Sequence, residues 1–118
     1  MRETSDSELV YRLASAAEWR LANETGVVPL REIDVRDGYV HLSTRSQVLG
    51  TARLHFAGEN DLLALEIPLS CLSPVKFELA PSRGEAFPHL YGELRREHVT
   101  SAIPLIWAAG DFSFGSPK

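Results

Sequence analysis

Hydrophobic and polar residues alternate in several short stretches of this chain, which is typical of strands. In one such stretch, Val40 and Leu42 would point to one face of an extended chain. Tyr39, His41 and Ser43 would point to the other face. The first pair suits a hydrophobic core, whereas the second set combines an aromatic ring, an imidazole and a hydroxyl group. The pattern therefore predicts a strand whose polar face lines a cleft for a small polar ligand.

Capping residues predict two helices. Ser15 with Glu18 fits a capping box, and Gly26 is expected to end the helix that follows. Thr44 with Gln47 fits a second capping box, so a helix is expected to begin at the next residue. The free amide groups at the start of this second helix would lie beside the histidine strand and favour an anion such as phosphate.

Further hydrophobic stretches predict the remaining strands. The run at 62–67 is almost continuously apolar, which indicates a strand buried on both faces at the centre of a sheet. The alternation at 75–79 predicts a strand with one solvent-facing side. Pro104 interrupts the last run and indicates an edge position or a bulge. The strands are expected at 9–13, 39–43, 62–67, 75–79, 87–91 and 99–107.

Three segments lack this periodicity. Residues 29–37 have too little of it to predict an element, and the tail after Ala109 contains Gly and Ser and is expected to fray. Residues 81–85 combine Pro, Ser and Gly, which predicts a mobile surface loop. Because strands outnumber helices by about six to two in this interpretation, the pattern favours an α+β domain over alternating βαβ units.

Length and composition narrow the class of protein. A chain of 118 residues with 44% hydrophobic residues is the size of one domain with one core, so a single domain is expected over 1–118. The formal net charge of −4, from 12 basic and 16 acidic residues, makes duplex DNA or RNA an unexpected partner. Composition leaves the oligomeric state open.

Cysteine and histidine usage points to a reducing compartment and to no metal site. Cys71 is the only cysteine, so an internal disulfide is excluded. No apolar run approaches the ~18 residues of a membrane span, and the polar start of the chain has no hydrophobic signal region behind it. The four histidines have none of the short spacings of helical metal sites. A cytoplasmic protein without a membrane segment is therefore expected.

A second group of site-like residues lies late in the chain. In an extended segment, Phe87, His89 and Tyr91 would share one face, and Pro88 and Gly92 would shape the backbone around them. This group repeats the aromatic ring, imidazole and hydroxyl group of the first strand. The alternative is structural, because an aromatic-Pro-His run is also an ordinary way to close a core, and a single strand histidine is more often structural than catalytic.

These two groups resemble the domain of unknown function 952 family of small bacterial proteins. That family is similar in fold to ADP-ribosyltransferases, so the resemblance implies an α+β domain of two packed, mainly antiparallel sheets with about two helices. It also implies a cleft for nicotinamide adenine dinucleotide (NAD). The residues that carry the resemblance are 37–44, Gln47, Thr51, Ala52, Phe56, Asp61, Leu62 and 87–92.

The resemblance implies roles for particular residues. His41 with Ser43 or Thr44 would contact the ribose, and an aromatic residue such as Tyr91 would stack on the nicotinamide. A late carboxylate would assist the reaction. The catalytic candidates are His41, His89, Tyr91, Glu78 and Glu93, and the NAD-binding candidates are Tyr39, His41, Ser43, Thr44, Gln47 and Tyr91.

Three functions fit the sequence. The first is an enzyme that transfers or hydrolyses an ADP-ribosyl group, for which a carboxylate must stabilise the positive charge that develops on the ribose. A related reaction, removal of a ribose 2'-phosphate from RNA, would instead need His41 and His89 to converge with Arg83 or Arg95. The second function is a non-catalytic module that binds a nucleotide or ADP-ribose, and the third is a protein-interaction domain with structural histidines.

Overall fold

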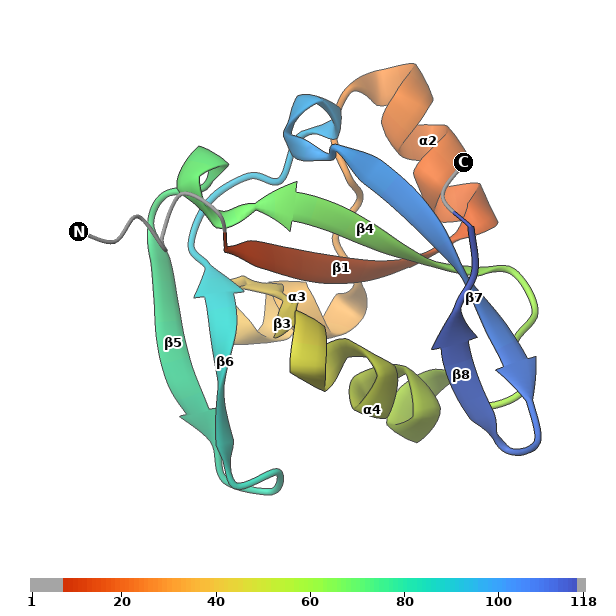
Figure 1. Ribbon diagram of the computed structural model, residues 1–118. Helices are drawn as coiled ribbons and strands as arrows, with labels where there is room; N and C mark the ends of the chain where they lie inside the picture. Colours follow the sequence, from red (N-terminus) through yellow and green to blue (C-terminus); the bar gives the residue numbers. More distant parts are fainter. Residues whose placement is uncertain (1–7, 117–118) are drawn as a thin grey trace.

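The computed structural model describes residues 8–116, which form two antiparallel sheets with three α-helices (Figure 1). Five strands in the order β3-β1-β4-β7-β8 make the larger sheet, and three in the order β2-β6-β5 make the smaller one. The predicted α+β class and the mainly antiparallel pairing are confirmed. The strands are β1 (Leu9–Ser15), β2 (Val40–His41), β3 (Ser43–Thr44), β4 (Leu62–Pro68), β5 (Val75–Ala80), β6 (Glu85–Leu90), β7 (Ser101–Ala108) and β8 (Asp111–Phe114).

The larger sheet is buried on both faces. Its central strand is β4, as the continuous apolar run predicted, and β4 pairs with β1 on one side and β7 on the other. Val10 and Ala14 of β1 belong to one hydrophobic cluster, and Tyr11 and Leu13 belong to another. Alternate residues of a strand point to opposite faces, so the two clusters lie on opposite sides of this sheet.

The two predicted helices are α2 (Ala16–Thr25) and α4 (Arg45–Phe56), and they pack against opposite clusters. The Ser15 hydroxyl accepts a hydrogen bond from the Glu18 amide, and the Glu18 carboxylate accepts one from the Ser15 amide. Gly26 follows α2 with a positive φ of 86°. The Gln47 side chain accepts from the Thr44 amide at the start of α4.

The histidine strand is divided between the two sheets. β2 pairs with β6 in the smaller sheet, whereas β3 pairs with β1 in the larger one. The prediction of one continuous strand at 39–43 was therefore wrong, although Val40 and Leu42 are buried as expected. The chain crosses from one sheet to the other at Leu42, which places His41 at the junction.

Two segments without a clear sequence pattern form regular structure. Residues 29–37 contain the short helix α3 (Glu32–Asp37). Residues 111–114 of the tail form β8, which pairs with β7, so the expectation that the tail frays was wrong for them. Residues 117–118 lie outside the described part of the chain. β7 is thus an interior strand, and Pro104 lies where its pairing with β4 ends and its pairing with β8 is about to begin. Two short 3-10 helices cover Leu69–Cys71 and Arg96–His98.

The outer strand of the smaller sheet, β5, buries its apolar side only in part, because Val75 packs against the core but the next two apolar residues do not. Phe77 is 48% exposed and Leu79 is 64% exposed, although the alternation predicted that they face a core. They lie beside cavities between the β5-β6 hairpin and the rest of the molecule. The hairpin lies to the left of α4 in Figure 1, and residues 81–84 form its turn as predicted.

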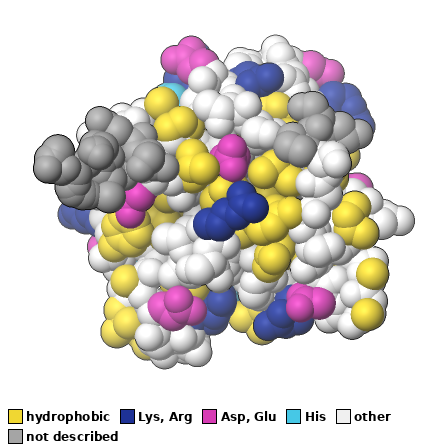
Figure 2. All heavy atoms as spheres, in the orientation of Figure 1, with side chains coloured by type: hydrophobic (Ala, Val, Ile, Leu, Met, Phe, Trp, Pro, Cys, Tyr) yellow, Lys and Arg dark blue, Asp and Glu magenta, His cyan; other side chains and the backbone are white. Residues whose placement is uncertain are grey.

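One face of the molecule, seen as spheres in Figure 2, carries charged side chains of both signs scattered among hydrophobic ones. No broad basic surface covers that face. Among residues 8–116, no helix is long and apolar enough to cross a membrane.

Candidate functional site

A buried carboxylate, Asp34 of α3, joins three parts of the chain that are distant in sequence. Arg12 of β1 donates to it through Nη2 at 2.6 Å and Nη1 at 3.1 Å. His41 of β2 donates through its backbone amide at 3.1 Å, and its Nδ1 lies 2.7 Å from Asp34 Oδ1. Burial alone would raise the pKa of Asp34, but the hydrogen bonds from His41 and Arg12 outweigh it and hold that pKa well below its usual range.

The His41 ring lies between two carboxylates. Its Nδ1 contacts Asp34, and its Nε2 lies 3.0 Å from Oδ2 of Asp37 at the end of the same short helix. An ionised carboxylate only accepts hydrogen bonds, so both contacts are hydrogen bonds only when the ring carries a proton on each nitrogen. The two carboxylates thus occupy both ring nitrogens of His41.

The His89 ring is held differently, by one carboxylate. Its Nδ1 lies 2.7 Å from Oε1 of Glu78 on β5, and the Tyr91 hydroxyl donates to the same oxygen at 2.6 Å. The hydrogen bond from Tyr91, followed by that from His89, lowers the pKa of Glu78. The bond to Glu78 in turn raises the pKa of Tyr91 to about 12. An ionised Glu78 therefore fixes the Nδ1–H form of a neutral His89 and leaves its Nε2 lone pair free.

The two histidine rings are neighbours, because His41 and His89 are opposite each other in the pairing of β2 with β6. Their ring centroids are 5.7 Å apart. Tyr39 stacks on His89 with centroids 3.9 Å apart and an angle of 17° between the planes. The ring centroids of Tyr91 and Tyr39 are 5.3 Å apart. The two groups of residues that the sequence singled out thus form one cluster of aromatic rings.

Both histidines line a cavity of about 690 Å³, which we call the histidine cavity. Its walls include four arginines and three histidines but one carboxylate, Asp37. Three of the four arginines pair with carboxylates, so the excess positive charge of the lining comes from the fourth. The charged and hydroxyl side chains that line it are Arg12, Arg31, Arg36, Arg83, Asp37, His41, His55, His89, Tyr11, Tyr39, Ser43, Thr51 and Ser82.

Arg83 differs from the other three arginines of this cavity. Each of the others pairs with a carboxylate: Arg12 with Asp34, Arg31 with Glu18 and Arg36 with Asp37. Arg83 has no carboxylate within ion-pair distance in the part of the chain that the structure describes. Its Nη1 donates to the Thr51 hydroxyl at 3.2 Å, and its guanidinium lies 4.8 Å from the centre of the Phe87 ring. Arg83 therefore brings an unneutralised positive charge to the cavity.

The other predicted site residues lie in several places. Tyr39 and Ser43 line the histidine cavity, whereas Tyr91 and Glu78 are outside its lining and contact the far side of the cluster through His89. Glu93 pairs with Arg95 at 2.8 Å, away from both histidines and outside the lining. The structure therefore brings Arg83, and not Arg95, together with the histidines.

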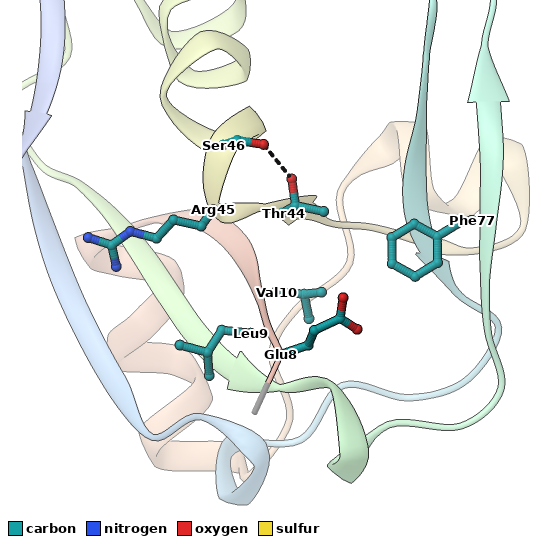
Figure 3. Close-up of a pocket in the computed structure, with 7 residues that line it drawn as sticks. All are labelled: Glu8, Leu9, Val10, Thr44, Arg45, Ser46 and Phe77. Atoms are coloured by element: carbon teal, nitrogen blue, oxygen red, sulfur yellow. Dashed lines mark hydrogen bonds between the residues drawn. The ribbon is translucent and has the colours of Figure 1, made fainter. Parts of the chain in front are cut away.

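Gln47 and Thr44 also lie outside the histidine cavity. The Gln47 amide is buried and donates to the Ala86 carbonyl at 2.8 Å and to the Glu85 carboxylate at 3.1 Å, so it ties α4 to β6. Thr44 lines a second cavity of about 400 Å³ at the start of α4. Figure 3 shows its hydroxyl bonded to Ser46, with Arg45 and Phe77 on opposite sides of it. This second cavity contains no histidine, so it offers less for proton transfer.

A protein-family model matches residues 13–102, a range that includes His41 and His89. That model is described as protein of unknown function (DUF952). The chain belongs to this family. The match confirms the family resemblance predicted from the sequence, and the family name assigns no activity.

Solved structures share the whole architecture. The crystal structure of protein CC0527 from Caulobacter crescentus is 33% identical, with a TM-score of 0.79 over 93% of this chain and 93% of that chain. The solution NMR structure of the same protein is 35% identical, with a TM-score of 0.76 over 88% of this chain and 90% of that chain. No match was found among curated proteins.

Sequence reasoning did not assign four residues that build this site, Arg12, Asp34, Asp37 and Thr51, although Asp37 and Thr51 are among those that carry the family resemblance. Asp34 and Asp37 lie in the segment without periodicity. The signal that could have found them is their short distance in sequence from His41, with the turn residue Gly38 between them. Arg12 is a charged residue inside a hydrophobic strand, where full burial requires a partner. Thr51 lies one helical turn beyond Gln47 on α4. Within 8–116, no group of three or more His, Cys, Asp or Glu side chains is arranged to hold a metal ion.

Proposed function

We propose that this chain binds a phosphorylated nucleotide of the NAD or ADP-ribose class in the histidine cavity. The observation that carries the proposal is Arg83, the one arginine of the lining without a carboxylate partner among the described residues, in a cavity that His89 and Tyr39 also line. A concave, basic site with aromatic rings suits a ligand that combines anionic phosphate with a ring system. The ADP-ribosyltransferase-like fold that the resemblance implies makes NAD the first ligand to test.

We further propose that the bound nucleotide reacts at its ribose, with His89 as the general base. Glu78 holds the Nδ1 proton of His89, so Nε2 can take a proton from a water or an acceptor hydroxyl group. With NAD, the oxygen of that acceptor bonds to the anomeric carbon of the ribose, and the bond from that carbon to nicotinamide breaks. Neutral nicotinamide leaves with the bonding electron pair, and the proton of the acceptor remains on His89.

Under this proposal His41 positions the wall of the cavity and does not accept a proton. Both of its ring nitrogens already contact carboxylates, so neither is free to accept a proton from the ligand or to donate to it. Tyr39 stacks on His89 and supplies an aromatic surface beside the ribose.

A second candidate function is a binding module that does not turn its ligand over. The observation that favours it is the state of the carboxylates: Asp37 is paired, and Glu78 lies behind His89. Neither is free to stabilise positive charge on a ribose. The two candidates share the same ligand class and differ in turnover.

Binding is tested by calorimetric titration of the wild-type chain with NAD and ADP-ribose. Heat of binding that disappears in His41→Ala but persists in His98→Ala supports the proposal, because His98 lies on the 3-10 helix outside the cavity. The absence of binding of either nucleotide to the wild-type chain would refute it.

Turnover is tested by following nicotinamide release from NAD. His89→Gln removes the base while keeping a polar side chain, and it should lower the rate by roughly 100-fold or more, as expected for loss of general base catalysis. Glu78→Gln should also lower the rate because the orienting charge is lost. Binding of NAD without nicotinamide release by the wild-type chain would favour the binding module.

A further inference from the structure

Arg83, Thr51 and Ser43 form a row of polar side chains along one wall of the histidine cavity. The Ser43 hydroxyl donates to Thr51 Oγ1 at 3.5 Å, and Arg83 Nη1 donates to the same oxygen at 3.2 Å. They come from β3, α4 and the β5-β6 turn, so the folded chain brings together residues that are far apart in sequence. All three line the cavity.

The hydrogen bonds within this row leave donors unused. A hydroxyl oxygen accepts two hydrogen bonds and donates one. Thr51 Oγ1 already accepts from Arg83 and Ser43, so its own proton is left for another acceptor. Arg83 has five N–H groups, of which one is used by Thr51. The free donors of the row are thus the remaining N–H groups of Arg83 and the Thr51 hydroxyl, whereas Ser43 uses its one proton to orient Thr51. Donors on a positively charged group beside a hydroxyl donor suit an anion.

The position of the Arg83 guanidinium is fixed before any ligand binds. Its Cζ atom lies 4.8 Å from the centre of the Phe87 ring. The backbone amides of Arg83 and Gly84 both donate to the Ala80 carbonyl at 2.9 Å, and these bonds close the turn that carries Arg83. On the helix side, a Cβ placed at Gly50 would lie 3.6 Å from Nη2. An arginine held in this way loses less conformational entropy when it binds a phosphate.

The distance from this row to His89 sets the size of the ligand. Phe87 and His89 are alternate residues on the same face of β6, so their side chains are spaced by ~7 Å. Arg83 packs over Phe87, so an anion bound to it lies about one phosphorylated ribose away from the His89 ring. A phosphate bound to Arg83 would anchor the ligand and place its ribose beside His89.

We propose that Arg83 and Thr51, the latter oriented by Ser43, bind the phosphate group attached to the ribose of the nucleotide, so that the cavity selects a phosphorylated ribose over the free nucleoside. This inference rests on the proposed function of the histidine cavity. It adds the phosphate subsite and the direction of the ligand, with phosphate toward the β5-β6 turn and ribose toward His89.

Two probes that differ by one phosphate test it: nicotinamide mononucleotide and nicotinamide riboside, titrated by calorimetry into the full chain. The wild-type chain should bind the mononucleotide ~10- to 100-fold more tightly than the riboside, as expected for hydrogen bonds to a charged group. In Arg83→Gln this ratio should fall to near unity through weaker binding of the mononucleotide. Arg53→Gln is the matched control, because Arg53 is an exposed arginine of α4 that pairs with Asp111, and it should keep the wild-type ratio.

The outcomes separate this inference from the proposed function. If both probes bind and Arg83→Gln leaves their ratio unchanged, the phosphate subsite is wrong while nucleotide binding stands. If neither probe nor NAD binds the wild-type chain, the proposed function fails and the subsite falls with it. The side-chain Nε–H resonance of Arg83 gives a second readout in the wild-type protein, and it should shift with the mononucleotide and not with the riboside.

Discussion

Replacing Asp34 with asparagine should destabilise the fold more than any other change in the site. The substitution keeps the size of the side chain but removes its charge. The Asp34 side chain is fully buried and that of Arg12 is 5% exposed, so Asp34→Asn leaves a guanidinium inside the protein without a counter-charge. Removing one member of a buried ion pair costs about 3–5 kcal/mol. Since domains of this size unfold with about 5–15 kcal/mol, the loss is a large fraction of the total.

Urea denaturation followed by tryptophan fluorescence measures this loss, because Trp19 and Trp107 are partly buried against the two clusters. Asp37→Asn is the control: Asp37 also contacts His41, but its side chain is partly exposed and its other partner, Arg36, is 70% exposed. Its replacement should change the free energy of unfolding far less than Asp34→Asn, because solvent screens exposed pairs.

The ion pair of Arg12 with Asp34 also predicts how the loss of stability in Asp34→Asn depends on pH. The pKa of Asp34 is lower in the folded chain than in the unfolded one, so its contribution is complete above the unfolded pKa of ~3.9 and is lost as pH falls toward the folded pKa. The difference in stability between wild type and Asp34→Asn should therefore be constant from neutral pH to about pH 5 and shrink in stronger acid.

A double-mutant cycle with Arg12→Met tests whether the ion pair causes the effect. The double variant should cost less than the sum of the two single variants, with a coupling of about 0.5–3 kcal/mol. The reasoning is refuted if Asp34→Asn costs less than about 1 kcal/mol, or if the two substitutions are additive.

Three further predictions concern single residues around the site. Tyr91→Phe removes the first hydrogen bond that lowers the pKa of Glu78, so NMR titration should show that pKa moving back toward its usual value; an unchanged pKa would contradict the assignment. Gln47→Ala breaks the buried link from α4 to β6 and should lower the free energy of unfolding by about 1–3 kcal/mol in a urea melt; a neutral result would show that water replaces it. Gly50→Ala places a methyl group in a helix interior at an ordinary van der Waals distance of 3.6 Å from Arg83, so it should raise the free energy of unfolding by about 0.5–1 kcal/mol in a urea melt. A lower free energy of unfolding would mean that the contact with Arg83 is tighter than described.

Local signals in the sequence predicted the capped helices, and non-local contacts account for what was missed. The Ser15 and Thr44 capping boxes act within three residues, so the pattern of the chain contains them. The helix α3 has no such periodicity, because Arg12 and His41 hold its Asp34 from other elements. The strand β8 depends in the same way on pairing with β7.

The candidate site was predictable in part for the same reason. Two motifs with the same residue types suggested that His41 and His89 converge, and the strand register places them opposite each other. The assignment of Thr44 and Gln47 to a ligand site rested on their closeness in sequence to His41. They lie outside the histidine cavity because the chain changes sheets after His41.

An NMR titration of the isotope-labelled wild-type chain with ADP-ribose tests the central claim most directly. The account predicts that the resonances of Ser43, Thr51, Arg83 and His89 shift together and saturate with one dissociation constant, while those of the distant His98 do not move. Shifts confined to residues outside the histidine cavity, or none at ligand concentrations far above that of the protein, would contradict it.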